Sequence, residues 1–516
     1  MTRRIIAGYI LVCTMFLCLY GCVIKEKNKG EVENNETVVL KWAVAGLGEQ
    51  KDTISVWKKF NEELQKYLPG TKVEFEYFEI ADYGEKWKLM SSSQEDLDIV
   101  WTGYMIDYVS EVKKGCYMPL DDLIDKYAPS LKEEIPENML ALQRVDGKLY
   151  SIPSMQQMVS YVSTLSIDVN MYEKYKDYIN PEELAEFFAS HDKMDEECWD
   201  KIEEYIELLY KNGDLPNGIS GFDNHAEKGY EWVRNPYKIE DFGEDYIVKN
   251  YYRTPEYKLF VDTYSDWYKK GYIRKDVLKT ELNNAIYNIS GKGGYLVGQG
   301  YFPSDSEMKM AENKVERSYV NIPFSDTHYI PSAAAATSTA ISSNCKNPER
   351  AIKLIELMNT EKGKDLYNLL VYGIEGIHYT KSDDERVMPV GYSANGTPTK
   401  DSPYGQYKWA LGNTFNAYEV YSEDDNKLLK KEFIKKVNDS ARSSKIMGFK
   451  LNTEPIKDEL KQIDAVVEEY KTILNSGAAD DAESLYNEFI GKLIKAGDDK
   501  VVAEINRQIQ EWRKTK

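Results

Sequence analysis

Cysteine and histidine, the side chains that most often hold metal ions, are few in this chain and widely spaced. The 516 residues include 6 Cys and 4 His, and no two His residues form a His-x-x-His pair. Cys116, Cys198 and Cys345 are far apart, which fits neither a disulfide framework nor a zinc-ligand pattern. The sequence therefore predicts neither a metal site nor a cofactor.

A glycine-rich run, GKGGYLVGQG at residues 291–300, raises the question of phosphate binding. Phosphate loops need glycines at set offsets and a helix that follows. Neither Gly-x-Gly-x-x-Gly nor Gly-x-x-x-x-Gly-Lys-Ser/Thr fits this run, and Pro303 with polar residues follows it. The run therefore predicts a sharp turn at Gly291–Gly294, a buried strand at 295–297 and open backbone at Gly298 and Gly300.

Acidic residues are abundant, with 86 Asp and Glu against 66 Lys and Arg, and the formal net charge is −20. A surface of this charge repels nucleic acid, so we expect no nucleic-acid partner. A glycoside hydrolase would need two carboxyl groups at a set separation, one with a raised pKa. No motif singles out such a pair, and a solvated acidic surface is the simpler interpretation.

Tyrosine and tryptophan are the unusual feature of the composition, with 40 Tyr and 9 Trp against 15 Phe. Both side chains offer a flat apolar face with a polar tip. The axial C–H groups of a sugar ring pack well on such a face, while its hydroxyl groups form hydrogen bonds around the rim. Biased residue usage is the alternative explanation, and composition alone does not decide between the two.

The elements that position these aromatic side chains are strands that alternate with helices. The first segments are strands at 38–45, 72–78 and 97–101 and helices at 53–68 and 83–92. This order predicts an α/β fold whose sheet is covered on both faces. Ligands bind such sheets at the carboxyl ends of strands, here at Gly46–Glu49 and Thr102–Tyr104.

The second half of the chain reads as loops followed by helices. Residues 212–250 are rich in Gly, Asn and Pro, which predicts a long loop region. Residues 181–189 and 199–211 are expected to be helical. Near the C-terminus, apolar residues recur at helical spacing from Ile456 to Leu474, and two more helices are expected at about 481–495 and 498–513.

The N-terminus has the features of an export signal. Arg3 and Arg4 precede the almost wholly apolar residues 5–20, which are too few for a comfortable membrane span. Leu19-Tyr20-Gly21-Cys22 resembles the lipobox of bacterial lipoproteins, in which the Cys receives diacylglycerol and becomes the new N-terminus. The resemblance implies a signal peptide at 1–21, lipidation of Cys22 and a flexible tether at 22–36. An ordinary secretory signal or an uncleaved anchor is the alternative.

Several short stretches carry a second resemblance by their order along the chain. They are Leu97–Thr102, Gly115 with Pro119-Leu120-Asp121, Gly147–Pro153, Gly291–Gly300, Asn347–Ala351, Tyr372–Gly376, Gly412–Phe415, and Met447–Phe449 with Pro455–Lys457. With the lipobox in front, this series resembles extracellular solute-binding proteins of family 1, the carbohydrate ABC transporter type, in their long lipoprotein subgroup.

The resemblance implies a two-lobed, periplasmic-binding-protein-like fold of type II, with central mixed sheets, crossover hinge segments and an added C-terminal helical region. Lobe 1 would comprise 37–158 and 325–380, and lobe 2 would comprise 160–322 and 385–516. The hinge segments would lie at the junctions between these ranges, and the lobes would close around a ligand.

The same resemblance implies the partners and the place of action. A lipid-anchored protein on the extracellular face of the cell membrane would bind an oligosaccharide without cleaving it. It would then deliver the sugar to the permease subunits of an ABC importer, acting as a monomer. A binding protein for peptides or other non-sugar solutes is the alternative, and a surface glycoside hydrolase is a further one.

Candidate ligand-binding residues follow from the strand ends and from the resemblance. Aromatic candidates are Trp101, Tyr104, Trp232, Tyr301 and Phe302, and polar candidates are Glu49, Asp107, Gln156, Gln157 and Asn413. The family commonly places a sugar-stacking ring at the position of Tyr301. Trp101 could instead be a core residue, Trp232 a loop anchor and Asn413 a helix cap, and the carboxylates could simply be solvated.

Some long relatives carry a calcium loop in the second lobe. The corresponding stretch here is NGDLPNG at 212–218, in which Asp214 is the single carboxylate and the ligand spacing of an EF-hand is missing. We therefore expect no calcium ion at this place.

Overall fold

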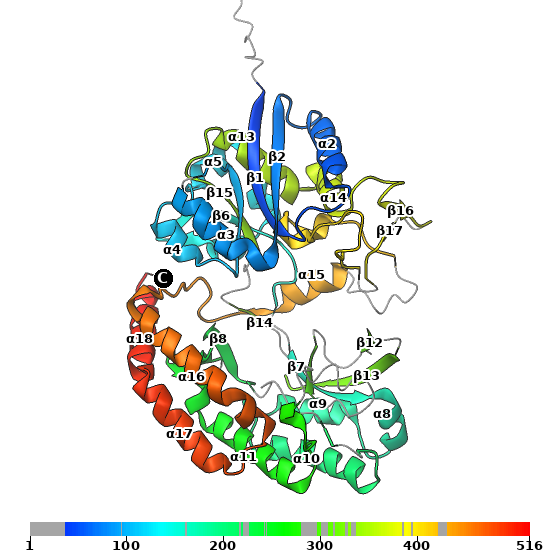
Figure 1. Cartoon of the computed structure of the whole chain (residues 1–516), viewed down its shortest axis with the longest axis vertical. Coiled ribbons are helices and arrows are strands. Elements are labelled where there is room, and N and C mark those ends of the chain that lie inside the picture. The colour runs from blue at the N-terminus through cyan, green and yellow to red at the C-terminus, as the bar shows by residue number, and fades with distance from the viewer. Residues whose placement is uncertain are drawn as a thin grey trace, which may run out of the picture. The chain divides into compact units, whose positions relative to one another are not determined.

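A computed structural model describes residues 37–515, with gaps at 94, 160–161, 216–217, 220–226, 242, 244, 280–296, 301–307, 313–314, 326–328, 332–336, 384–385, 394–395 and 422–430. The expected signal peptide, the tether and Cys22 lie outside the described residues, as do Tyr301 and Phe302. Residues Val39–Lys516 form one compact unit, whose two largest sheets have five and four strands (Figure 1).

The first sheet has five strands in the order β2-β1-β3-β15-β6. Its strands are β1 (Val38–Gly46), β2 (Thr71–Glu79), β3 (Ile99–Gly103), β6 (Ser151–Pro153) and β15 (Thr337–Ile341). β1 and β3 are parallel, whereas β15 runs antiparallel to both β3 and β6. The sheet is therefore mixed, and two of its strands come from distant parts of the sequence.

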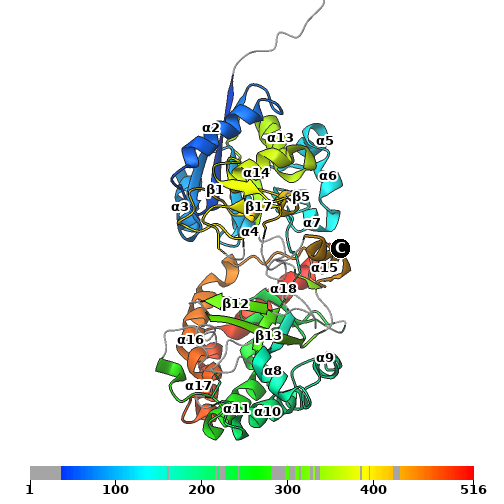
Figure 2. The same cartoon turned by 90° about the vertical axis from the view of Figure 1, so that its right-hand side faces the viewer.

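Helices cover this sheet because their apolar residues recur on one face. In α2 (Thr53–Leu64), Val56, Phe60 and Leu64 are spaced four residues apart and are all buried. The helix ends at Leu64, four residues before the predicted end. The other elements of this region are α3 (Ile80–Ser93), α4 (Tyr108–Lys113), α5 (Asp121–Tyr127), α6 (Leu131–Glu134), α7 (Glu137–Ala141), α13 (Pro348–Asn359), α14 (Lys364–Tyr372), β4 (Arg144–Val145), β5 (Lys148–Leu149), β16 (Tyr379–Lys381) and β17 (Val387–Pro389). Figure 2 shows α13 and α14 beside this sheet.

The second sheet has four strands in the order β11-β7-β13-β12, and all neighbours are antiparallel. They are β7 (Val162–Asp168), β11 (Val297–Gly300), β12 (Met308–Glu312) and β13 (Val315–Pro323). The chain passes between the two sheets after β6 and again after β13, near the predicted crossovers. The α/β architecture with two mixed or antiparallel sheets confirms the predicted fold class.

The glycine-rich run differs from its prediction. Residues 291–296 lie outside the described part of the chain, and the strand β11 occupies Val297–Gly300. Gly298 and Gly300 are paired with Thr164 and Val162 of β7, so their backbone is part of a ladder. They belong to an edge strand that pairs with β7 on one side, and the expectation of open backbone at these two positions stays a prediction.

Residues 230–250 form a small three-stranded sheet where a long loop was expected. Strands β8 (Tyr230–Arg234), β9 (Tyr237–Glu240) and β10 (Val248–Asn250) are antiparallel neighbours in the order β10-β9-β8. Glycine and asparagine content concealed this sheet, because the segments between the strands carry the turn residues.

The remaining elements of this half are helical or very short. They are α8 (Val169–Tyr175), α9 (Pro181–Ala189), α10 (Glu196–Lys211), α11 (Pro255–Lys270), α15 (Lys431–Ser440), α16 (Lys457–Ser476), α17 (Ala482–Lys495), α18 (Asp498–Arg513), β14 (Tyr329–Ile330) and β18 (Arg442–Ser443). Short 3-10 turns are η1 (Tyr251–Arg253), η2 (Val277–Lys279), η3 (Glu361–Gly363), η4 (Lys408–Ala410), η5 (Thr414–Asn416) and η7 (Glu454–Ile456).

The three C-terminal helices belong to the core of the second sheet's region. The predicted apolar stripe of α16 is buried at Leu460, Ile463, Val467, Tyr470 and Leu474. These side chains join one cluster with residues of β7, α10 and α11. α16 contacts α11, α17 and α18, as Figures 1 and 2 both show. The predicted C-terminal helices are therefore confirmed, and they share a core with the rest of this region.

The lobe boundaries stay a prediction, but one contact pattern favours a change. Residues 387–421 pack on the first sheet's helices, although the predicted lobe 2 resumes at residue 385. Tyr404 donates a hydrogen bond to the carbonyl of Leu370 at 2.8 Å, and the amide of Tyr418 donates to Asn368 at 2.6 Å. We propose that the first lobe extends to about Tyr421.

Candidate functional site

The carboxyl ends of β1 and β3 meet at one edge of the first sheet, because the two strands are parallel. Trp101, on β3, is completely buried there. Its ring contacts the rings of Tyr83 at 5.2 Å, Trp409 at 5.8 Å and Tyr104 at 6.0 Å between centroids. The burial favours the core alternative for Trp101, which supports the rings above it.

Gly103 makes room for the Trp101 ring. Residues 101 and 103 point to the same face of β3, because side chains alternate along a strand. A Cβ atom on Gly103 would lie 2.0 Å from Cζ2 of Trp101. The indole therefore lies across the backbone of the strand end, where only glycine leaves enough space.

Three rings near Trp101 are at least partly exposed. Tyr104 is 62% exposed, and Tyr407 and Trp409 are half-buried. The rings of Tyr407 and Trp409 stack at 5.1 Å with an angle of 14° between their planes. We call Tyr83, Trp101, Tyr104, Tyr407 and Trp409 the Trp101 cluster. The sequence analysis did not select Tyr407 or Trp409. Two aromatic residues two positions apart, just before Gly412–Phe415, could have indicated a pair of rings at this site.

The indole N–H of Trp101 is buried and has no hydrogen-bond partner among the described residues. A buried unpaired N–H group costs about 1–3 kcal/mol. This buried donor is a polar group that a water molecule or a ligand could satisfy.

The loop after β1 is tied to a distant segment. Gln406, which is buried, donates a hydrogen bond from Nε2 to the carbonyl of Gly48 at 3.2 Å. Gln50 donates from Nε2 to the carbonyl of Thr399 at 3.2 Å. Glu49 lies between these two ties and is exposed at the edge of the sheet. A carboxylate held in this way can accept hydrogen bonds from ligand hydroxyl groups.

The other polar candidates of this region already have partners in the protein. Asp107 caps α4, since its Oδ1 accepts a hydrogen bond from the amide of Ser110 at 3.1 Å. Asn413 is buried, accepts from the amide of Phe415 at 3.0 Å and donates to the carbonyl of Asn359 at 3.2 Å. These contacts favour the cap alternative for Asn413, and a ligand-binding role for either residue stays a prediction.

Gln156 and Gln157 follow β6 and are both half-buried. Gln156 donates from Nε2 to the hydroxyl of Thr337, the first residue of β15, at 3.1 Å. Its side chain is therefore placed at the same strand-end edge as Tyr104, where β15 begins and β3 ends.

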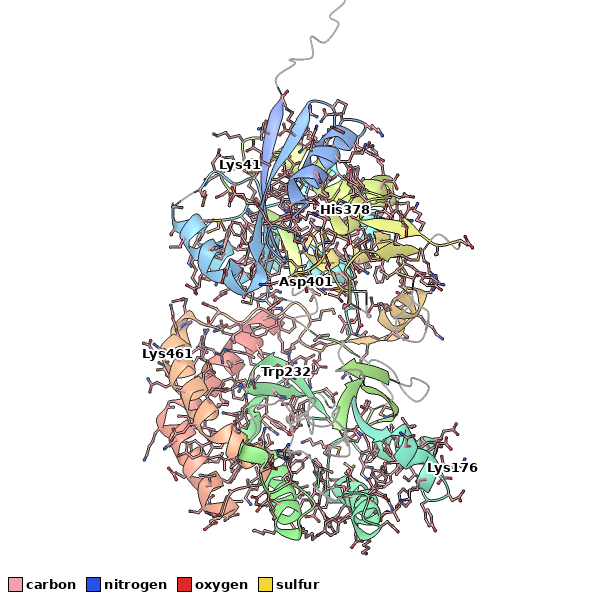
Figure 3. All side chains as sticks on the ribbon, turned by 45° about the vertical axis from the view of Figure 1, so that its right-hand side comes forward. Lys41, Lys176, Trp232, His378, Asp401 and Lys461 are labelled. Atoms are coloured by element: carbon pink, nitrogen blue, oxygen red, sulfur yellow. The ribbon has the colours of Figure 1, made fainter. Side chains whose placement is uncertain are left out.

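Trp232 lies on β8 and is 49% exposed (Figure 3). Lys238, its partner across the β8–β9 pair, is 1% exposed and places its ammonium group 4.5 Å from the centre of the Trp232 ring. Burial lowers the pKa of Lys238, and the carboxylate of Glu227, with which it forms an ion pair, opposes that effect. A cation beneath the ring and a free outer area make Trp232 a supported platform.

Three potential metal ligands that the sequence analysis did not group come together at the start of α10. Ligand-type atoms of His191, Asp195 and Cys198 lie within 4.8 Å of one another. Asp195 caps the helix by accepting from the amide of Cys198 at 3.0 Å. Burial raises the pKa of the Cys198 thiol to about 12, so a metal would have to displace its proton.

The loop in which calcium was not expected has an internal cation. Lys174 places its ammonium nitrogen 2.7 Å from Oδ1 and 2.6 Å from Oδ2 of Asp214. Tyr175 donates a further hydrogen bond to the same carboxylate. Both oxygens of Asp214 therefore have partners from α8.

Two comparisons of sequence identify relatives. A family model described as "Domain of unknown function (DUF3502)" matches residues 445–514. A carbohydrate ABC transporter substrate-binding protein of Streptococcus pneumoniae is 23% identical over 474 residues, which covers 91% of this chain and 90% of that protein. Among the described residues, no helix has the length and apolar character that crossing a membrane requires.

Solved structures share the fold. The N-glycan transport solute binding protein NgtS from Streptococcus pneumoniae has a TM-score of 0.69 at 22% identity, covering 92% of this chain and 99% of that protein. An extracellular solute-binding protein from Bifidobacterium longum subsp. infantis has a TM-score of 0.61 at 14% identity. The match covers 92% of this chain and 98% of that protein. These likenesses establish the two-lobed fold. The relative that matches 91% of the chain is a carbohydrate ABC transporter substrate-binding protein, so this chain is similar in sequence and in fold to the family that its sequence motifs predict.

Proposed function

We propose that this chain is the substrate-binding component of an ABC importer and that its ligand is an oligosaccharide. The carrying observation is the similarity to a carbohydrate ABC transporter substrate-binding protein over 91% of the chain. In this role the chain acts as a monomer, binds and releases its ligand unchanged, and transfers it to the permease subunits.

Two aromatic surfaces support a sugar ligand. The Trp101 cluster exposes Tyr104, and the second sheet's region exposes Trp232 over a buried ammonium group. Each flat ring can pack against the C–H face of one sugar residue, and nearby groups such as Glu49 and Gln156 can bond to hydroxyl groups. Several such contacts together suffice for micromolar affinity, about −8 kcal/mol.

Attachment to the membrane would come from Cys22. A diacylglycerol group on this residue would hold the protein on the extracellular face, and residues 22–36 would separate the folded part from the bilayer. A Cys22→Ala variant expressed in a Gram-positive host is then expected in the culture medium, while the unaltered chain stays with the membrane fraction.

A ligand screen by thermal shift tests the function directly. A ligand that binds only the folded state raises Tm. The structural relative NgtS has been solved with Man5GlcNAc, so this oligosaccharide, fructooligosaccharides and a set of peptides form the first panel. We expect an oligosaccharide to raise Tm and to be recovered intact. A shift with peptides alone, or cleavage of the sugar, would contradict the proposal.

A substitution at Trp232 tests the platform. Trp232→Ala removes a half-exposed ring, and we expect about tenfold weaker oligosaccharide binding, since a stacking contact contributes about 1–1.5 kcal/mol. Tyr178→Ala is the matched control, because Tyr178 is 78% exposed. Isothermal titration calorimetry should show unchanged affinity for the control; equal losses in both variants would remove Trp232 from the site.

A further inference from the structure

The segment matched by the model of unknown function contacts the sheet that carries Trp232. We propose that α16 and α18 hold the β8–β9–β10 sheet in the position that presents Trp232 to the ligand, so that the C-terminal segment sets the affinity of the site. This inference rests on the proposed function, since it assigns a positioning role within the same site.

Asp498, the first residue of α18, collects hydrogen bonds from three places in and beside this sheet. It is completely buried. Its Oδ1 accepts from the hydroxyl of Tyr237 on β9 at 2.9 Å and from Nδ2 of Asn250 on β10 at 2.7 Å. Its Oδ2 accepts from Arg253 in η1 at 2.7 Å. One carboxylate therefore joins two strands and the turn that follows them to the start of a C-terminal helix.

Asn506, two turns further along α18, covers the edge of the same sheet. Its Oδ1 accepts from the amide of Val248 at 2.8 Å, and its Nδ2 donates to the carbonyl of Val248 at 3.3 Å. β10 is an edge strand in the order β10-β9-β8. The side-chain amide thus pairs with both backbone groups of one residue of an edge strand, as a neighbouring strand would.

A third tie reaches the strand that bears Trp232. Arg234, two residues after Trp232 on β8, donates to Asp464 of α16 through two nitrogen atoms, at 2.8 and 3.4 Å. The pair is partly exposed, so it contributes little to the free energy of unfolding. Its geometry nevertheless fixes the end of β8 against α16.

These ties matter because a small sheet of short strands is marginal on its own. β8, β9 and β10 have five, four and three residues, and such a sheet needs packing against other elements to be stable. Lys238, buried beneath Trp232, must also stay in place for the ring to keep its support. The C-terminal helices supply the fixed surface that this arrangement requires.

Two variants of α18 separate positioning from general stability. Asn506→Ala removes both bonds to Val248 of the sheet. Gln508→Ala is the matched control: its side chain also makes two bonds to the backbone of one residue, Asn452, at 2.9 Å each, but that residue lies outside the sheet. Both substitutions introduce alanine into the same helix.

Hydrogen exchange and calorimetry give the readouts on the full mature chain. For Asn506→Ala we expect faster amide exchange at 230–250 and several-fold weaker binding of the oligosaccharide found in the ligand screen. Gln508→Ala should leave both unchanged. In a Trp232→Ala background, Asn506→Ala should cause no further loss of affinity, because the positioning role acts through that ring.

The outcomes distinguish the two proposals. If the unaltered chain binds no oligosaccharide, the proposed function and the role in affinity fail together, while unchanged exchange at 230–250 in Asn506→Ala would overturn the positioning role by itself. If the unaltered chain binds but Asn506→Ala and Gln508→Ala lose affinity equally, or the loss persists without Trp232, the inference is wrong. Should Asn506→Ala not fold, Asp464→Asn takes its place, with the exposed Asp458→Asn of the same helix as control, and the same criteria apply.

Discussion

The Trp101 cluster and the Trp232 sheet are two aromatic surfaces built in opposite ways. Trp101 is completely buried at the end of a strand in a five-stranded sheet, and Trp232 is half-exposed on a three-stranded one. The first ring is held by rings that surround it on several sides. The second is held from below by Lys238 and, through its sheet, by helices about 250 residues away in sequence.

The difference in burial between the two tryptophans assigns one to the stability of the fold and the other to ligand binding. A fully buried indole contributes mainly to the free energy of unfolding, because it removes a large apolar surface from water. A half-exposed indole contributes little to that free energy and leaves an open face for a ligand. We therefore expect substitutions at the two tryptophans to affect different measurements.

Trp101→Ala should have the largest effect. The change leaves a cavity among Tyr83, Tyr104 and Trp409, and removal of a buried large aromatic side chain costs about 3–5 kcal/mol. Chemical denaturation followed by circular dichroism would measure this loss. Trp232→Ala is the control, and we expect it to lower the free energy of unfolding by less than about 1 kcal/mol. A mild effect of Trp101→Ala would indicate that the ring leaves the core readily and would restore it as a candidate for direct ligand contact.

The comparison also shows how far the sequence could be read. The strands 38–45, 72–78 and 97–101 were predictable because their apolar residues continue or alternate over a full strand length. The orientation of the Trp101 ring was not predictable, because strand periodicity gives the face on which a side chain lies and leaves its rotamer open. Gly103 was the available signal, because a glycine two residues from a large ring leaves space on the same face.

The Trp232 sheet was hidden for a different reason. β8 to β10 are short, and glycine, asparagine and proline between them favoured a loop. Alternation in Tyr230-Glu231-Trp232 was visible but too brief to outweigh those residues. Its ties to Asp498 and Asn506 join positions about 250 residues apart, and no local pattern encodes such contacts.

Gly103→Ala sharpens the first half of the comparison. The added Cβ would overlap the Trp101 ring, so the indole or the strand must shift, and overpacking of this kind costs about 1–3 kcal/mol. Denaturation curves of the variant should shift to lower denaturant concentration. Gly491→Ala in α17 is the matched control, because no atom lies within 4 Å of its added Cβ, and alanine there should stabilise the helix by about 0.5–1 kcal/mol. Equal effects in the two variants would show that the Trp101 ring does not need Gly103.

Lys408, which lies between Tyr407 and Trp409 of the Trp101 cluster in the sequence, gives the smallest effect. Its ammonium group lies 5.9 Å from the centre of the Tyr372 ring, and burial and, secondarily, the charge of Lys431 lower its pKa from 10.5 to about 8. In the unfolded chain the pKa returns to about 10.5, so between these values the unfolded state binds more protons and the free energy of unfolding rises with pH. Below pH 8 the folded state carries the cost of a poorly hydrated ammonium group.

Lys408→Met removes this titrating group while keeping a side chain of similar length. We expect the variant to be more stable than the unaltered chain at pH 7, on the order of 1 kcal/mol because the side chain is only half-buried and solvent screens its charge. The difference in free energy of unfolding between the variant and the unaltered chain should shrink as the pH rises from 8 toward 10.5. Lys269→Met, at an exposed site on α11, should show a gap that does not change over this range. A constant difference for Lys408→Met as well would mean that its ammonium group stays hydrated in the folded chain.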